Sequence, residues 1–173
     1  MICLRPLRPG DEEAAVRWSE DPVFCRANDW ELDLPPERVR RHWRGLIEAP
    51  PPDFVRLGLE RGGRLIGYGD WAFITPQSAE LGLAIGESRL WGQGLGVEAG
   101  RLLIAYAFGV LGLPQVRAEV HAPNTRSRRL MPKLGFREVG VVGEETYGGQ
   151  PTPLIGFTLS REGWNALSPK PRG

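Results

Sequence analysis

The chain has 173 residues, of which 41% are hydrophobic and 25% are charged, and its formal net charge is +1. This size and composition predict a single globular domain, residues 1–173, with a sizeable core. The small net charge excludes a general electrostatic attraction to nucleic acid or to an anionic membrane.

The first residues and the cysteines favour a cytoplasmic protein. The N-terminus lacks the apolar stretch of a signal peptide, and no apolar run approaches the ~20 residues of a transmembrane helix. Cys3 and Cys25 form neither a C-x-x-C pair nor part of a metal-ligand cluster. We therefore expect buried, reduced thiols and no metal site.

Residues 1–52 predict one strand and two helices. A strand at 2–6 is followed by a turn into a helix that Asp11 caps. A second helix spans 36–48, because Pro36 stands at its start and three prolines at 50–52 end it. The residues expected to be buried are Ala14, Ala15, Val16 and Trp18 in the first helix, and Val39, Trp43, Leu46 and Ile47 in the second.

An acidic loop lies between these helices and contains Asp29, Trp30, Glu31 and Asp33. In one interpretation it is a solvated loop. In the other it borders a substrate site, where the carboxylates attract a cationic amine and the indole covers its aliphatic part. The sequence leaves both interpretations open.

Residues 53–89 predict three strands, at 54–59, 65–74 and 80–85, with a hairpin turn at 61–64. Gly82 indicates a bulge within the third strand. Glu80 is the one carboxylate of that strand. It is either a surface residue in a cross-strand pair or a base that deprotonates an amine through a water, which requires a raised pKa.

A glycine-rich turn precedes an apolar helix in residues 91–110. Gly92, Gly94 and Gly96 alternate there, and glycine permits positive φ and close approach of a ligand. The free N–H groups and positive dipole of a helix start bind anions, above all phosphates. The turn can also serve only to lead the chain into the helix. Residues 94–99 match the dinucleotide fingerprint G-x-G-x-x-A, but residues 86–91 separate them from the preceding strand, which argues against that reading.

The last third predicts a strand at 115–120, which ends at His121, a surface residue or a base. Asn124 is the predicted N-cap of the next helix and Ser127 its third residue. Strands at 137–142 and 153–159 follow, joined by a loop at 143–149 that holds Tyr147. A capped helix at 160–164 comes last.

Two blocks in this order resemble the GNAT superfamily of N-acetyltransferases. Trp91-Gly-Gln-Gly-Leu-Gly96 is similar to its acyl-CoA pyrophosphate loop, Q/R-x-x-G-x-G/A. Asn124-Thr-Arg-Ser127, followed by Lys133-Leu-Gly-Phe136, is similar to its second hallmark, N-x-x-S ending in K-L-G-F. Trp91 in place of Gln or Arg resembles the branch that acetylates alanine or serine N-termini of ribosomal proteins. The resemblance covers residues 65–136 well and both ends weakly.

The resemblance implies an α/β fold with a mixed, mostly antiparallel seven-stranded sheet flanked by helices, in which strands 4 and 5 splay to admit acetyl-CoA. Many GNAT enzymes place a tyrosine, as general acid, where this chain has Met131, which cannot donate a proton. Ser127 is therefore the predicted acid and Glu80 the predicted base. The arginines at 126, 128 and 129 either reach the 3′-phosphate or form an exposed helix face. The predicted cofactor contacts are Ala84, Ile85, Trp91, Gly92, Gln93, Gly94, Leu95, Gly96, Val97 and Asn124, and the predicted acceptor contacts are Asp29, Trp30, Glu31, Asp33 and Tyr147.

The expected reaction is direct acetyl transfer from acetyl-CoA to a primary amine. At pH 7 an α-amine of pKa ~7.7 is neutral about one time in six, and a lysine amine of pKa ~10.4 about once in 2,500. A site without an obvious strong base therefore suits a protein N-terminus. Small-molecule amines (polyamines, aminoglycosides, amino acids) and a non-catalytic acyl-CoA-binding module are the alternatives, and a homodimer is left open.

Overall fold

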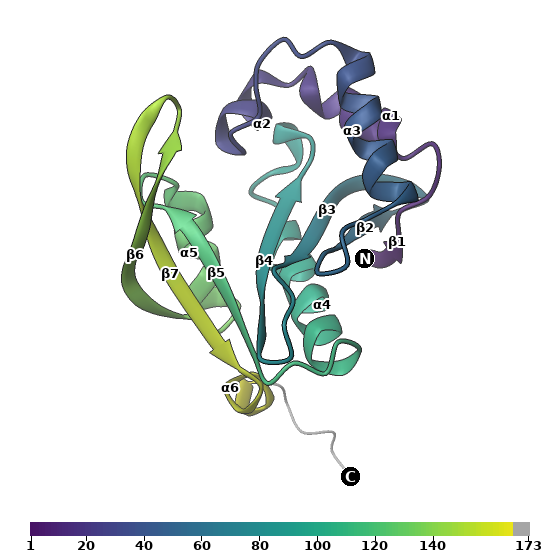
Figure 1. Cartoon of the computed structure of the whole chain (residues 1–173). Helices are drawn as coiled ribbons and strands as arrows, with labels where there is room; N and C mark the ends of the chain where they lie inside the picture. The colour runs from purple at the N-terminus through teal and green to yellow at the C-terminus, as the bar shows by residue number, and fades with distance from the viewer. Residues whose placement is uncertain (168–173) are drawn as a thin grey trace.

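A computed structural model describes residues 1–167, so the last six residues of the predicted domain lie outside the described residues. Seven strands form one sheet in the order β1-β2-β3-β4-β5-β7-β6 (Figure 1). All neighbours are antiparallel except β4 and β5, which run parallel. The predicted mixed, mostly antiparallel α/β sheet is therefore confirmed. The strands are β1 (Cys3–Pro6), β2 (Val55–Arg61), β3 (Arg64–Ala72), β4 (Ser78–Ile85), β5 (Gln115–His121), β6 (Arg137–Tyr147) and β7 (Gln150–Ser160).

Helices cover both faces of the sheet, because side chains of successive strand residues point to opposite sides. Tyr68 of β3 packs with the N-terminal helices, and Trp71 of the same strand packs with α4. The helices are α1 (Glu12–Ser19), α2 (Pro22–Ala27), α3 (Pro36–Glu48), the 3₁₀ turn η1 (Ser88–Leu90), α4 (Leu95–Gly109), α5 (Thr125–Lys133) and α6 (Arg161–Leu167). No helix among residues 1–167 is long and apolar enough to cross a membrane.

The opening between β4 and β5 is the feature that positions the site. The two strands pair only at Ser78–Glu80 and Gln115–Arg117. Beyond that point β4 continues its pairing with β3 to Ile85, while β5 follows β7 to His121. The splay between strands 4 and 5 is therefore confirmed. The predicted bulge at Gly82 is wrong, since Gly82 pairs with Asp70 in an unbroken register, and the opening arises because β5 leaves β4.

The short helix α2 was not predicted from the sequence, although its start carries two common helix-start signals. Asp21 Oδ1 accepts hydrogen bonds from the N–H groups of Val23 and Phe24 at 3.0 and 3.2 Å, and Pro22 occupies the first turn. Asp11, the predicted cap of α1, makes no capping bond. Its carboxylate instead binds Arg5 at 2.8 Å and the N–H of Arg8 at 2.8 Å, so it ties β1 to the start of α1.

The loop predicted at 143–149 is also wrong. Residues 143–147 continue β6, and only Gly148 and Gly149 turn the chain, with φ of +58° and +78°. Two successive positive φ values suit a tight two-residue hairpin, so β6 and β7 form one long ribbon.

Three burial predictions need adjustment. Leu46 and Ile47 of α3 are only half-buried, while Val39 and Trp43 are buried as predicted. Cys25 is buried but Cys3 is exposed, because β1 lies at the edge of the sheet. The apolar helix α4 buries one face and leaves residues 101 and 105 exposed.

Candidate active site

The glycine-rich turn has the conformation that its sequence indicates. Gly92 and Gly94 have φ of +77° and +79°, a region that side-chain-bearing residues rarely adopt. Gly94 is the N-cap of α4 and, having no side chain, leaves the first N–H groups of the helix without a side-chain cap. Such donors, together with the helix dipole, are suited to bind an anion.

A pocket of about 310 Å³ lies at this turn, between the splayed end of β4 and helix α5. Its charged lining residues are Arg126, Arg129 and Lys133, and no carboxylate among the described residues lines it. Arg128 is turned away, bonded to the carbonyl of Ala122 at 3.1 Å and paired with Glu138. The pocket is therefore positively charged and lies against the helix start. Its lining residues are Leu83, Ile85, Leu90, Trp91, Gly92, Gly94, Leu95, Gly96, Val97, Thr125, Arg126, Ser127, Arg129, Leu130 and Lys133.

Three of the predicted cofactor contacts lie outside this pocket. Ala84 faces the opposite side of the sheet and packs with the N-terminal helices. Gln93 donates its side-chain amide to the carbonyl of Arg89 at 3.3 Å, and Asn124 caps α5. The other seven predicted residues are brought together as expected. Sequence reasoning missed Leu83, although strand alternation from Ile85 places both on one face.

Trp91 and Arg126 span the pocket from one wall to the other. The guanidinium carbon of Arg126 lies 3.4 Å from the centroid of the indole ring, a cation–π contact. The indole N–H donates to the carbonyl oxygen of Ile85 at 2.9 Å.

Helix α5 presents Ser127 to the same pocket. The Asn124 side chain accepts a hydrogen bond from the backbone N–H of Ser127 at 3.2 Å, which confirms the predicted cap. The cap uses the backbone of Ser127 and leaves its half-buried hydroxyl free of that task. Met131 lies one turn further and is buried, with 4% of its surface exposed.

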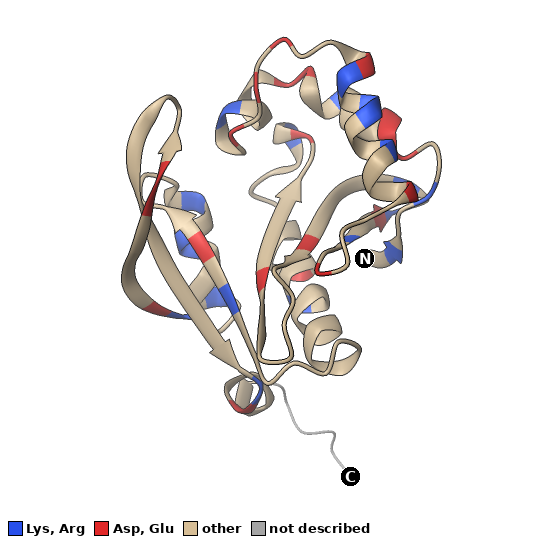
Figure 2. Ribbon diagram, viewed as in Figure 1, with Lys and Arg blue, Asp and Glu red and all other residues tan. Residues whose placement is uncertain are grey.

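Glu80 lies on the other face of the sheet, where β4 and β5 part. Its pKa is raised, chiefly by burial and by the nearby carboxylate of Glu119, while Arg117 at 3.5 Å acts to lower it and Glu145 to raise it. Figure 2 shows acidic bands on β4, β5 and β6 on either side of the opening. Glu80 and Ser127 thus flank the opening from opposite faces, so a donor and an acceptor can meet through it.

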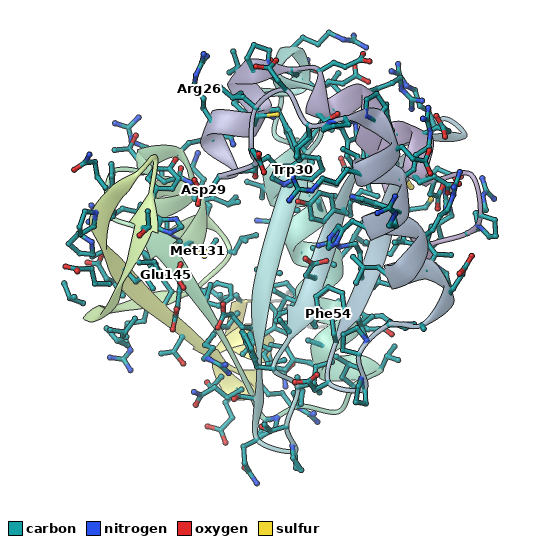
Figure 3. All side chains as sticks on the ribbon, turned by 45° about the horizontal axis from the view of Figure 1, so that its top comes forward. Arg26, Asp29, Trp30, Phe54, Met131 and Glu145 are labelled. Atoms are coloured by element: carbon teal, nitrogen blue, oxygen red, sulfur yellow. The ribbon has the colours of Figure 1, made fainter. Side chains whose placement is uncertain are left out.

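The top of the opening is bridged. The Tyr147 hydroxyl lies 3.4 Å from the carbonyl oxygen of Ala27 and donates to it, and Asp29 Oδ1 accepts from the N–H of Gly148 at 3.3 Å. Figure 3 shows Asp29 facing the β6–β7 hairpin, which also carries Glu145. These contacts join the loop after α2 to the hairpin. The face of the sheet that carries Glu80, which we call the acceptor face, is therefore enclosed above the opening as well as below it, where β4 and β5 pair.

The other residues of the acidic loop make contacts away from the hairpin or lie at the surface. Glu31 pairs with Arg38 at 3.5 Å, and Asp33 is exposed. Trp30 packs against Phe24 with ring centroids 5.0 Å apart. Of the three carboxylates of this loop, Asp29 is the one that bonds to the hairpin over the opening.

His121 also faces the acceptor side of β5. Its ring stacks on Tyr147 with centroids 4.4 Å apart. Its Nε2 lies 3.3 Å from Glu145 Oε2, but the approach lacks hydrogen-bond geometry, so the contact is electrostatic at most. No group of three or more metal-ligating side chains occurs within residues 1–167.

Together these elements define an α/β protein whose sheet opens over an anion-binding helix start. The chain belongs to the GNAT acetyltransferase domain family, whose model matches residues 1–137.

Two curated relatives share part of the sequence. The Uncharacterized N-acetyltransferase YoaA of Bacillus subtilis (strain 168) is 35% identical over 97 residues, which is 54% of this chain and 54% of that protein. The Uncharacterized N-acetyltransferase p20 of Bacillus licheniformis is 38% identical over 64 residues, 37% of this chain and 35% of that protein. The matched regions thus span about half or less of these relatives.

Solved structures match over nearly the whole fold. Spermidine N-acetyltransferase from Vibrio cholerae, in complex with CoA and spermine, has a TM-score of 0.81 at 20% identity over 95% of this chain and 98% of that one. Aminoglycoside acetyltransferase AAC(6')-Ib, in complex with coenzyme A, has a TM-score of 0.75 at 16% identity over 96% and 99%. At such identities the likeness establishes the fold.

Proposed function

We propose that this protein transfers an acetyl group from acetyl-CoA to the primary amine of a small molecule. The observation that carries the proposal is the opening between β4 and β5, with the glycine turn and the positively charged pocket on one face. On the other face lie the carboxylates of Glu80, Glu119 and Glu145, which we call the acidic wall. The pocket suits a phosphate-bearing donor, and the acidic wall suits an amine.

The chemistry is direct attack. The amine nitrogen bonds to the acetyl carbonyl carbon, the carbon–sulfur bond breaks, and the sulfur leaves as a thiolate. Glu80 takes the proton that the amine nitrogen loses, through a water, and its raised pKa improves it as a base. Ser127 gives a proton to the thiolate and recovers one from solvent. Positioning of the two substrates supplies the largest share of the reduction in the activation barrier, up to ~7–11 kcal/mol.

A small acceptor is favoured by two features. The bridge from Ala27 and Asp29 to the hairpin encloses the opening above and limits the room for a polypeptide laid across it. Glu80, a carboxylate with a raised pKa beside the opening, is placed to accept the proton of an ammonium group through a water, which serves amines other than α-amines as well. The known spermidine and aminoglycoside acetyltransferases of this fold act on small amines, which agrees with this choice.

A protein N-terminal α-amine is the second candidate, favoured by the motif at Trp91, which resembles the ribosomal-protein branch. Release of free thiol from acetyl-CoA, measured with a panel of small amines and with alanine- and serine-initiated peptides, separates the candidates. Turnover of small amines alone supports the proposal, and turnover of peptides alone favours the second candidate. CoA binding without any turnover would identify a non-catalytic module and overturn both.

A further inference from the structure

A second pocket, also of about 310 Å³, lies on the acceptor face of the sheet, under the loop after α2 and beside α3. It is separate from the pocket at the glycine turn and has no role in the proposal above. We call it the aromatic pocket. Its lining residues are Trp30, Glu31, Leu34, Arg38, Val39, His42, Trp43, Arg56 and Tyr68.

The walls of this pocket are aromatic rings. Trp43 meets Tyr68 edge to face with centroids 5.3 Å apart, and Trp30 lies 6.5 Å from Tyr68. Such a cage often holds a cation, but here Arg56 already lies over two of the rings, 4.3 Å from Tyr68 and 4.8 Å from Trp43. The protein's own Arg56 therefore occupies the position that a bound cation would take in such a cage.

Each charge that lines the pocket is balanced. Arg56 makes two hydrogen bonds of 2.7 Å with the carboxylate of Asp70. Arg38 pairs with Glu31 at the rim. Partial burial, reinforced by the charge of Arg56, lowers the pKa of His42, so its ring is uncharged at neutral pH. A charged ligand would find no free countercharge among these residues.

The aromatic pocket adjoins the opening. Tyr68 on its floor is the register partner of Ala84 on β4, and Asp70 is the partner of Gly82. Neighbouring strands are ~4.8 Å apart, and the small residues Gly82 and Ala84 put little bulk between the pocket and the opening. A cavity of ~150 Å³ can hold one benzene ring, so 310 Å³ is ample for one ring or two fused rings.

We propose that the aromatic pocket binds an uncharged aromatic group, and that this group is the body of the acceptor amine, joined to it by a short linker. The acceptor class is then arylalkylamines, whose ammonium group faces the acidic wall while the ring lies between Trp30, Trp43 and Tyr68. The second part of this proposal rests on the proposed function. Polyamines, charged along their length, do not suit the pocket.

The test compares His42→Trp, which fills the pocket from the exposed side of α3, with Arg41→Trp, which places the same indole at a neighbouring position outside it. The wild type should acetylate 2-phenylethylamine with a kcat/KM about tenfold or more above that for ethylamine. His42→Trp should abolish most of that preference, and Arg41→Trp should keep it. An equal kcat/KM for the two amines in the wild type, or an unaltered preference in His42→Trp, would overturn the acceptor assignment.

Binding of 2-phenylethanol, an unreactive alcohol, tests the pocket without acetyl-CoA. Calorimetry should show binding to the wild type and to Arg41→Trp and its loss in His42→Trp. No binding, or equal binding to all three proteins, overturns the pocket. If 2-phenylethanol binds in this pattern but no amine is acetylated, the pocket is supported and the acetyl-transfer proposal fails instead. Leu34→Phe repeats the test should His42→Trp fail to fold.

Discussion

Replacement of single glycines by alanine at the start of α4 can separate stability from CoA affinity. At Gly94, φ is +79° and nothing lies within 4 Å of an added Cβ, so alanine pays only the backbone cost, about 1 kcal/mol. At Gly96 the added Cβ would lie 3.5 Å from Leu130, an ordinary contact, and the residue is already helical. Alanine there should gain up to about 1 kcal/mol from helix propensity.

The two variants should therefore differ by roughly 2 kcal/mol in stability, with Gly94→Ala lowering Tm by about 3 °C and Gly96→Ala lowering it not at all. CoA affinity should behave otherwise. The methyl group added by Gly96→Ala enters the pocket beside Leu130 and keeps a phosphate away from the helix start. Loss of one N–H bond to that phosphate costs about 1.5 kcal/mol or more, which is roughly a tenfold rise in the Kd for CoA. Gly109→Ala, at the exposed end of the same helix, is the matched control.

The assays are thermal unfolding and isothermal titration with CoA. Gly96→Ala should be at least as stable as the wild type yet bind CoA about tenfold more weakly. Gly109→Ala should bind CoA as the wild type does. If Gly96→Ala keeps the wild-type Kd, the reasoning that places phosphate against this helix start is refuted.

Three further predictions concern the acid, the base and the packing. Ser127→Ala should lower the single-turnover rate constant about a hundredfold. It should not lower Tm, because the helix cap uses the backbone N–H of Ser127. An unchanged rate constant would identify water, not Ser127, as the acid. The pKa of Glu80 is raised above its ordinary 4.5, so as pH rises through the folded-state pKa the kcat/KM of the wild type should rise and its stability should fall. Glu80→Gln should remove both of these pH dependences. A pH dependence that persists in the variant belongs to another group. Gly86→Ala places a Cβ 2.1 Å from the Trp18 indole and should lower the free energy of unfolding in urea by about 3 kcal/mol. Gly45→Ala, which has open space around it, should not lower that free energy. Equal stabilities of the two variants would contradict the packing of Gly86 on Trp18.

The local elements were predictable where one local signal dominates. The helix at 36–48 has its predicted bounds, because proline favours its first turn and a run of prolines ends it. The turn at Gly92–Gly96 was readable for the same reason, since alternating glycines before an apolar helix specify positive φ and a bare helix start. The helix α2 carries an equally local signal, an aspartate followed by proline at its start.

Features that depend on pairing between distant strands were not predictable. Gly82 carries no signal that separates a bulge from a regular residue, and the opening beside it exists because β5 follows β7 instead of β4. Residues 143–147 contain a glycine and two glutamates and precede two more glycines, so their composition predicts a loop, whereas pairing with β7 makes them a strand. Edge strands tolerate such polar residues, so composition alone misleads there.

The sequence by itself determined the family-like order of motifs, the anion-binding turn, and Asn124 and Ser127 at the start of α5, because each depends on neighbours within a few residues. Only the tertiary structure decided which face each side chain serves. It put Ala84 and Glu80 on the acceptor face, turned Arg128 away from the pocket, and linked Asp29 to the hairpin across more than a hundred residues of chain. Strand alternation and register set those directions, and both are fixed by long-range pairing, which local sequence does not encode.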